Sequence, residues 1–129
     1  MKKTTATKPT EQKSVKSYSI DASGMSVGRV AAQAAKALMG KSHADYTPNI
    51  VSLVKVTISN AGKIRITEKK RLQKKYTDYS GHPGGLKIES LGSLIGRRGK
   101  GAAVRRAVER MIPRNTMKTS RLKRLIINE

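Results

Sequence analysis

The sequence predicts a single α/β domain with a small, partly parallel β-sheet. Three observations support this prediction. The 129 residues match the size of one ordinary domain. A strand-like segment, an amphipathic helix and a second strand follow one another, which is typical of α/β folds. Hydrophobic residues make up 36% of the chain, without Phe or Trp, so we expect one modest core of aliphatic side chains.

The first half of the predicted domain begins with a short strand over Tyr18–Asp21, which the turn signal Ser23-Gly24 ends. A helix is expected to follow. Ser26 is a suitable N-cap, and Gly40 is the expected stop, because glycine adopts the left-handed conformation at a helix end without strain. The apolar residues of one helical face are Val27, Val30, Ala31, Ala34 and Leu38.

A polar loop, Lys41–Asn49, separates this helix from the next strand. In that strand Val54, Val56 and Ile58 alternate with polar residues, as in a half-buried strand. Asn60-Ala61-Gly62 ends the strand, and Ile64–Thr67 is predicted to form another short strand.

The second half of the chain starts with a charged segment, Glu68–Lys75. Lys74–Asp78 is predicted to be a strand that leads into the glycine-rich loop Ser80–Gly85. Two helices are expected over Glu89–Arg97 and Ala102–Met111, the second ended by Pro113. Leu125–Ile127 suits a closing strand. No internal repeat is visible.

Charge is the strongest functional signal, with 28 Lys and Arg against 8 Asp and Glu and a formal net charge of +20. The cations gather in two clusters that contain almost no acids, unlike an ordinary mixed surface. The first consists of Lys63, Arg65, Lys69, Lys70, Arg71, Lys74 and Lys75. The second consists of Arg97, Arg98, Lys100, Arg105, Arg106, Arg110, Arg114, Lys118, Arg121, Lys123 and Arg124. We therefore predict that the protein binds a polyanion.

Nucleic acid fits this charge better than a membrane does. No apolar run approaches the roughly 18 residues that span a bilayer, and the cations occupy several elements instead of one amphipathic helix with bulky anchors. The second cluster is rich in Arg, whose planar guanidinium suits phosphate contacts and base stacking. Composition alone leaves DNA and RNA equally open. Residues 1–17 are predicted to be a flexible basic arm that precedes a domain over residues 18–129.

Two glycine-rich segments are candidate phosphate-binding loops. In Ser80–Gly85 the three glycines allow close approach of a backbone, and Tyr76, Tyr79 and Lys87 beside them favour RNA contact over a merely flexible surface loop. Leu94–Lys100 is similar to the GXXG loop of KH domains, which makes a KH-like single-stranded RNA- or DNA-binding regulatory module the alternative function. It is not a Walker A loop, because no Gly-Lys-Ser/Thr follows at the required spacing.

Enzyme and metal chemistry find little support in the sequence. The two histidines, His43 and His82, are far apart, and the carboxylates are scattered. The chain has no cysteine, so it can form neither a disulfide nor a thiolate zinc site. We expect no catalytic residues, no metal and no cofactor.

Several stretches together resemble the bacterial form of the ribosomal large-subunit protein thirteen family. The matching motifs run in the family's order: YSIDASGMSVGRVA from Tyr18, GKSHADYTP from Gly40, Asn60-Ala61 after the alternating strand, YTDYSGHPGGLK from Tyr76, and AVERMIP from Ala107, followed by a basic segment. The resemblance covers nearly the whole chain. The chain departs from the family pattern at Thr67-Glu68, at Asn115-Thr116-Met117, and at Gly99 and Gly101.

The resemblance implies a three-layer α/β/α sandwich without catalysis. It also implies that the protein binds large-subunit (23S-type) rRNA early in assembly, beside neighbouring ribosomal proteins, in cytoplasmic ribosomes. The RNA-contact positions that it implies are Lys41, His43, Tyr46, Thr47, Ser80, Gly81, His82, Gly84, Gly85 and Lys87, together with the basic C-terminal helix and tail. To these the charge clusters add Lys69, Lys70, Arg71, Lys75, Arg97, Arg98, Lys100, Arg105, Arg106, Arg110, Arg114, Lys118, Arg121 and Arg124 as predicted RNA-binding residues.

Overall fold

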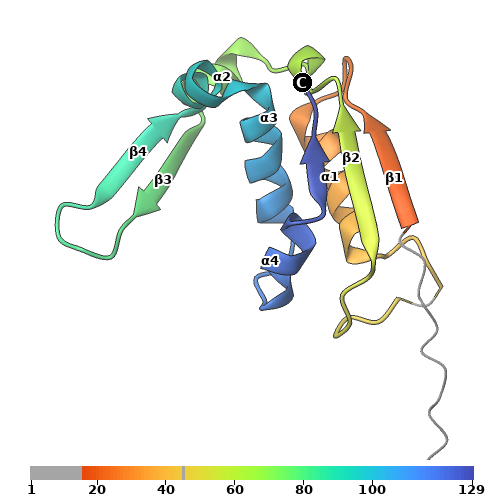
Figure 1. Cartoon of the computed structure of the whole chain (residues 1–129). Helices are drawn as coiled ribbons and strands as arrows, with labels where there is room; N and C mark the ends of the chain where they lie inside the picture. The colour runs from red at the N-terminus through yellow and green to blue at the C-terminus, as the bar shows by residue number, and fades with distance from the viewer. Residues whose placement is uncertain (1–15, 45) are drawn as a thin grey trace, which may run out of the picture.

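The computed structural model describes residues 16–44 and 46–129 and shows one mixed α/β domain (Figure 1). Its elements in chain order are β1 (Lys16–Asp21), α1 (Val27–Met39), β2 (Val54–Ser59), the 3₁₀ helix η1 (Ala61–Lys63), α2 (Glu68–Gln73), β3 (Lys75–Tyr79), β4 (Leu86–Ser90), α3 (Leu91–Met111), α4 (Met117–Leu122) and β5 (Leu125–Ile127). The predicted α/β domain is confirmed. The predicted N-terminal arm lies outside the described residues, except for Lys16 and Ser17, which begin β1.

The main sheet has the strand order β1-β2-β5, and both strand pairs are parallel. Val56 in the central strand pairs with Tyr18 on one side and with Leu125 on the other. The predicted alternation in β2 is confirmed, since Val54, Val56 and Ile58 are buried. The predicted closing strand β5 is confirmed as well.

Helix α1 forms where the apolar spacing predicts it. The face with Val27, Val30, Ala34 and Leu38 is buried against the sheet and α3. The helix ends at Gly40, which has the left-handed φ of 79° that the sequence predicts for this stop. Small alanines on the buried face let the helix backbone lie close to the strands.

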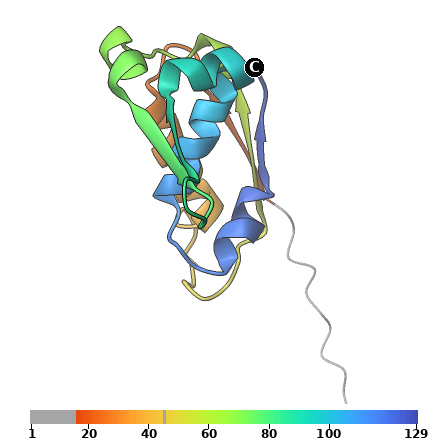
Figure 2. The ribbon, with the colours of Figure 1, turned by 90° about the vertical axis from the view of Figure 1, so that its left-hand side faces the viewer.

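Both long helices cover the same face of the sheet, since α1 packs against β2 and against α3 (Figure 2). The opposite face carries exposed Lys55 and Ile126. The α/β/α layering expected from the family resemblance is therefore corrected: among the described residues no helix covers the second face. The alternation along β2 explains this, because it places apolar side chains on one side only.

Strands β3 and β4 form an antiparallel hairpin beside the helices (Figure 1), and here "the hairpin" means residues 75–90. Strand β3 was predicted from the sequence. The prediction that a helix begins at Glu89 is wrong, because Leu86–Ser90 forms strand β4. Helix α3 begins only at Leu91, where the Ser90 hydroxyl accepts a hydrogen bond from the Ser93 N–H at 3.2 Å. This is an ordinary N-cap and explains the start of the helix.

Three short segments differ from their predictions. Ile64–Thr67 is not a strand, and only Arg65 there forms an isolated bridge, with Ser26. Helices α2 and α4 were not predicted. Each has only six residues and no sustained apolar face. Local propensity alone is too weak to form so short a helix, so both helices depend on packing against neighbouring elements.

Helix α3 is bent at Gly99, whose φ of 77° and ψ of 172° lie outside the helical region. Beyond the bend, the Gly101 N–H donates to the Glu129 carboxylate at 3.2 Å, and Lys100 Nζ donates to the Gly62 carbonyl at 2.8 Å. The second helical segment thus begins on a carboxylate supplied from beyond β5. An anionic acceptor at this end satisfies a free N–H and complements the helix dipole.

The core has two parts. The larger cluster lies between α1, the sheet and the second segment of α3, and includes Ile58, Val104 and Val108. The smaller lies under the hairpin, around Tyr76, Leu91 and Leu94. No helix within the described ranges is long and apolar enough to cross a membrane.

Candidate nucleic-acid interface

The hairpin packs on α3 through Tyr76, which is only 6% exposed. The guanidinium carbons of Arg106 and Arg110 lie 4.9 and 5.0 Å from the centre of its ring, and Lys74 Nζ lies 5.9 Å from it. Arg106 and Arg110 are one helical turn apart, so a single ring can hold both. The sequence placed Tyr76 beside an exposed loop as an RNA-contact aromatic. The structure corrects this, because Tyr76 is buried and organises cations instead.

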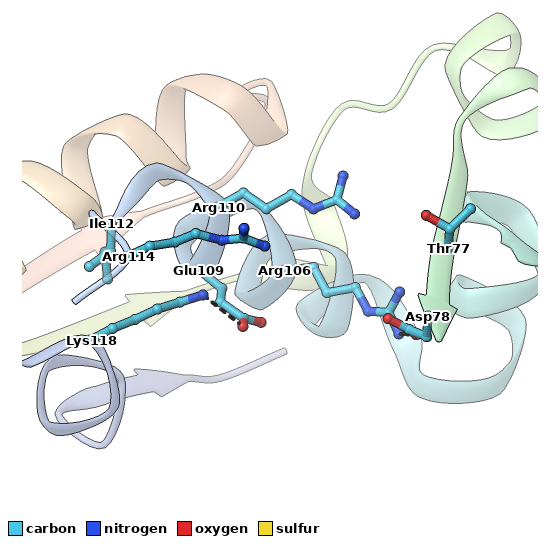
Figure 3. Close-up of a pocket in the computed structure, with 8 residues that line it drawn as sticks. All are labelled: Thr77, Asp78, Arg106, Glu109, Arg110, Ile112, Arg114 and Lys118. Atoms are coloured by element: carbon cyan, nitrogen blue, oxygen red, sulfur yellow. Dashed lines mark hydrogen bonds and ion pairs between the residues drawn. The ribbon is translucent and has the colours of Figure 1, made fainter. Parts of the chain in front are cut away.

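A hollow of about 380 Å³ lies between the hairpin and the C-terminal half of α3 (Figure 3). We call it the basic cleft, and its lining residues are Thr77, Asp78, Arg106, Glu109, Arg110, Ile112, Arg114 and Lys118. Four of the eight carry a positive charge and two carry a negative charge. The volume is within the range of pockets that hold small ligands, roughly 300–1,000 Å³. The cleft therefore offers an anion several donors at once.

Both acids of the basic cleft are paired with its cations. Arg106 Nη2 lies 3.1 Å from Asp78 Oδ2, and Lys118 Nζ lies 3.1 Å from Glu109 Oε1. The Asp78 side chain is 70% exposed and that of Glu109 is 46% exposed. Pairs open to water in this way contribute little to stability, about 0–1 kcal/mol each.

A second hollow of about 230 Å³ adjoins the same two arginines. Its lining includes Lys70 and Lys74 from the first charge cluster and Arg106 and Arg110 from the second. Residues that are far apart in the sequence are thus brought to one surface, which runs from α2 past Tyr76 to α4. The sequence predicted the two clusters but not that they meet.

The glycine-rich segment Ser80–Gly85 is the loop that joins the two strands of the hairpin. Gly81 and Gly84 have positive φ values of 88° and 76°, which explains glycine at these positions. The Gly85 N–H donates to the His82 carbonyl at 3.0 Å, so this N–H is already hydrogen-bonded within the loop. The hairpin carries exposed Tyr79 (63%), and Lys75 and Lys87 are exposed elsewhere on its two strands.

The loop after α1 lies elsewhere. It sits below the sheet in Figure 1, while the tip of the hairpin projects on the far side of the molecule. His43 is half-buried, with its Nε2 2.8 Å from the Tyr18 hydroxyl. Lys41, Tyr46 and Thr47 are exposed. The structure therefore does not bring this loop together with Ser80–Gly85.

Several predicted RNA-binding cations make contacts within the protein. Arg97 bonds both carboxylate oxygens of Glu89, at 2.8 and 2.9 Å, and Arg71 lies 3.8 Å from Glu68. Arg124 donates to the Ser52 carbonyl. The predicted cations that are exposed and make no ion pair with a described residue are Lys41, Lys69, Lys70, Lys75, Lys87, Arg98, Arg105, Arg110 and Arg114.

The GXXG-like segment does not form a separate loop. Residues Gly96–Arg98 are helical, and only Gly99 leaves the helical conformation. Arg97 is held by Glu89. The segment thus lacks the exposed four-residue loop that a KH-like module uses to clamp single strands.

Arg121 is the one charged residue buried within the described ranges, at 2% exposure. Its Nε and Nη2 atoms have no hydrogen-bond partner there. A surface contact with RNA, as predicted from the sequence, does not fit this position. Removing buried donors without partners recovers their desolvation cost, about 1–3 kcal/mol.

We therefore expect Arg121→Met to raise the free energy of unfolding by about 1–2 kcal/mol, because Met keeps the length of the side chain without its buried donors. Urea denaturation followed by circular dichroism would measure it. Arg114→Met, at an exposed position, is the control and should change stability by less than about 0.5 kcal/mol. A loss of stability in Arg121→Met would contradict this expectation and would mean that the buried arginine stabilises the fold.

Known proteins provide an independent comparison. Residues 15–129 match the family model described as Ribosomal protein L13. The chain is 40% identical to the large ribosomal subunit protein uL13 of Pelotomaculum thermopropionicum over 95% of this chain and 85% of that protein. It is 40% identical to uL13 of Nitrosococcus oceani and 41% identical to uL13 of Pelobacter propionicus, over 84% and 85% of this chain and 75% and 77% of those proteins.

Proposed function

Because the chain belongs to the ribosomal protein L13 family, we propose that it is a structural constituent of the large ribosomal subunit that binds and packs large-subunit rRNA. The observation that carries RNA binding is the surface around Tyr76, where cations of both sequence clusters meet. Lys and Arg that neutralise phosphates allow RNA segments to pack closely. Neighbouring large-subunit proteins are its further partners.

The proposed RNA-binding surface has three parts. The first is the basic cleft with the adjoining second hollow. The second is the hairpin from Lys75 to Lys87, whose exposed Tyr79 is available for base stacking. The third is formed by Lys41, His43, Tyr46 and Thr47 of the loop after α1, which lies apart from the hairpin tip and would contact a different RNA segment. The hairpin tip and the loop after α1 are thus two separated contact regions, which suits a protein that holds RNA segments together.

We propose a structural role without a catalytic step. The family is one of structural proteins. Within residues 16–44 and 46–129, no three acidic or histidine side chains gather as metal ligands would. The cations of the basic cleft face one another and their counter-ions, an arrangement that binds anions.

The test is sedimentation of a tagged copy from cell lysate on a sucrose gradient, after washing at moderate and at high salt. We expect the tag to migrate with large subunits through the high-salt wash, because a protein embedded in rRNA exchanges slowly. Quantitative mass spectrometry of the same fractions should find it close to equimolar with other large-subunit proteins. A tag that appears only in light fractions contradicts a constituent role and favours a free RNA-binding protein.

A further inference from the structure

We propose that the basic cleft binds the phosphodiester backbone of RNA by ion-pair exchange, in which Asp78 and Glu109 occupy, in the free protein, the places that two phosphate groups take in the complex. This inference rests on the proposed function. It adds that two carboxylates of the protein neutralise the cations of the cleft until RNA binds. The ligand class is an RNA strand that presents neighbouring phosphates to the cleft.

The two acids are suited to this exchange by where they lie. Asp78 comes from the hairpin and Glu109 from α3, and each places a carboxylate oxygen 3.1 Å from a cation of the cleft. A phosphate oxygen accepts the same hydrogen bonds and carries the same charge. Both carboxylates are substantially exposed, so each can turn into water when a phosphate arrives.

The cations, in contrast, are held in place. The Arg106 and Lys118 side chains are each only 23% exposed. Arg106 also lies over the Tyr76 ring, as does Arg110. Figure 3 shows both pairs within one hollow, with Arg110 and Arg114 also extending from the helical side. Cations already fixed by their neighbours lose little conformational entropy on binding.

The charges of the cleft favour RNA once the exchange has occurred. With Asp78 and Glu109 displaced, four cations still line the cleft. Arg106 keeps its 4.0 Å contact with Glu89 Oε2, and Arg114 makes no ion pair with any described residue. In the free protein the same acids reduce mutual repulsion among these cations. The acids therefore stabilise the empty site and weaken binding by a modest factor.

The experiment measures binding to large-subunit rRNA transcribed in vitro, at one fixed salt concentration near 0.15 M. Asp78→Asn and Glu109→Gln each remove a competing carboxylate and nearly keep the shape of the side chain. We expect each to bind about two- to fivefold tighter than the wild type, the factor that corresponds to one exposed ion pair. Glu68→Gln is the matched control: it also removes one negative charge and one ion pair, with Arg71, but outside the cleft.

The outcomes are distinct. If Asp78→Asn and Glu109→Gln bind no tighter than Glu68→Gln, or bind more weakly than the wild type, ion-pair exchange is overturned while rRNA binding stands. If the wild-type protein does not bind the rRNA at all, the proposed function itself fails.

A second readout locates the phosphates directly. Phenylglyoxal modifies accessible guanidinium groups, and mass spectrometry identifies the labelled residues. In the wild-type complex we expect Arg106, Arg110 and Arg114 to be labelled at least fivefold more slowly than in the free protein, whereas exposed Arg29 on α1 keeps its rate. Equal labelling of the three cleft arginines in free and bound protein would refute the site.

Discussion

Gly99→Ala is expected to lower the free energy of unfolding by about 2–4 kcal/mol. At a φ of 77° and a ψ of 172°, Gly99 occupies a region that is essentially restricted to glycine, and a side chain there costs about 1–3 kcal/mol. A Cβ would also lie 2.1 Å from Glu129 Oε1 and push away the carboxylate that accepts from the Gly101 N–H. Loss of such a cap contributes about another 1 kcal/mol. Urea denaturation followed by circular dichroism measures the change.

Gly96→Ala is the matched control in the same helix. Gly96 is helical, and apart from its chain neighbours and the backbone of its own helix no atom lies within 4 Å of the position its Cβ would take. The same substitution should therefore stabilise the protein by about 0.5–1 kcal/mol. Glu129→Ala separates the loss of the cap from the backbone strain, because it removes the carboxylate acceptor while Gly99 itself stays unchanged. Equal effects of Gly99→Ala and Gly96→Ala would mean that α3 is not bent at Gly99.

The triple variant Arg106→Gln, Arg110→Gln, Arg114→Gln is expected to bind large-subunit rRNA at least about a hundredfold more weakly at 0.15 M salt, since hydrogen bonds to charged groups contribute about 1.5–3 kcal/mol each. The plot of log K against log salt should also become shallower by about 2, because each lost phosphate contact removes roughly 0.7–0.9 from the slope. Filter binding over a salt series measures both quantities.

A triple variant with the same charge elsewhere controls for net charge. Arg29, Lys36 and Lys55 are exposed and lie outside the basic cleft and outside both charge clusters. Changing all three to Gln should shift the slope by less than about 1. If both triple variants weaken binding equally, general attraction dominates and the basic cleft has no special role. Circular dichroism should first confirm that each variant is folded, since Arg106 and Arg110 pack on Tyr76.

The elements that the sequence predicted correctly are those with a strong apolar period. Helix α1 and strand β2 each bury one regular face, so the period that packs them is visible in the chain. Strand β4 was missed although Leu86 and Ile88 alternate with Lys87 and Glu89. Both Leu86 and Ile88 are 59% exposed, so this strand depends on pairing with β3 and not on burial. The bend at Gly99 depends on Glu129, which no local pattern connects to α3.

The candidate site was predicted in its charge but not in its geometry. The clustering of Lys and Arg in the sequence identified the cations of α3. Glu109 is the only acid in the same stretch of sequence, from Arg97 to Arg124. The pairing of Arg106 with Asp78 joins two segments far apart in the sequence, so only the fold reveals it. Charge counting could not separate Arg121, which is buried, from Arg114, which is exposed, because both occur in the same basic stretch.

The parallel order β1-β2-β5 has a consequence for the way the chain reaches its folded state. Strands β1 and β2 are moderately close in sequence, so we expect them to pair early, together with α1. The pairing of Val56 with Leu125 joins residues much farther apart in the chain. Closing such a long loop is entropically unfavourable and slows folding. In a chain with a net charge of +20, repulsion between the unpaired segments adds to this barrier. Glu129, whose carboxylate accepts from the second segment of α3, lies just beyond β5, so we expect sheet closure and completion of this helix to be coupled.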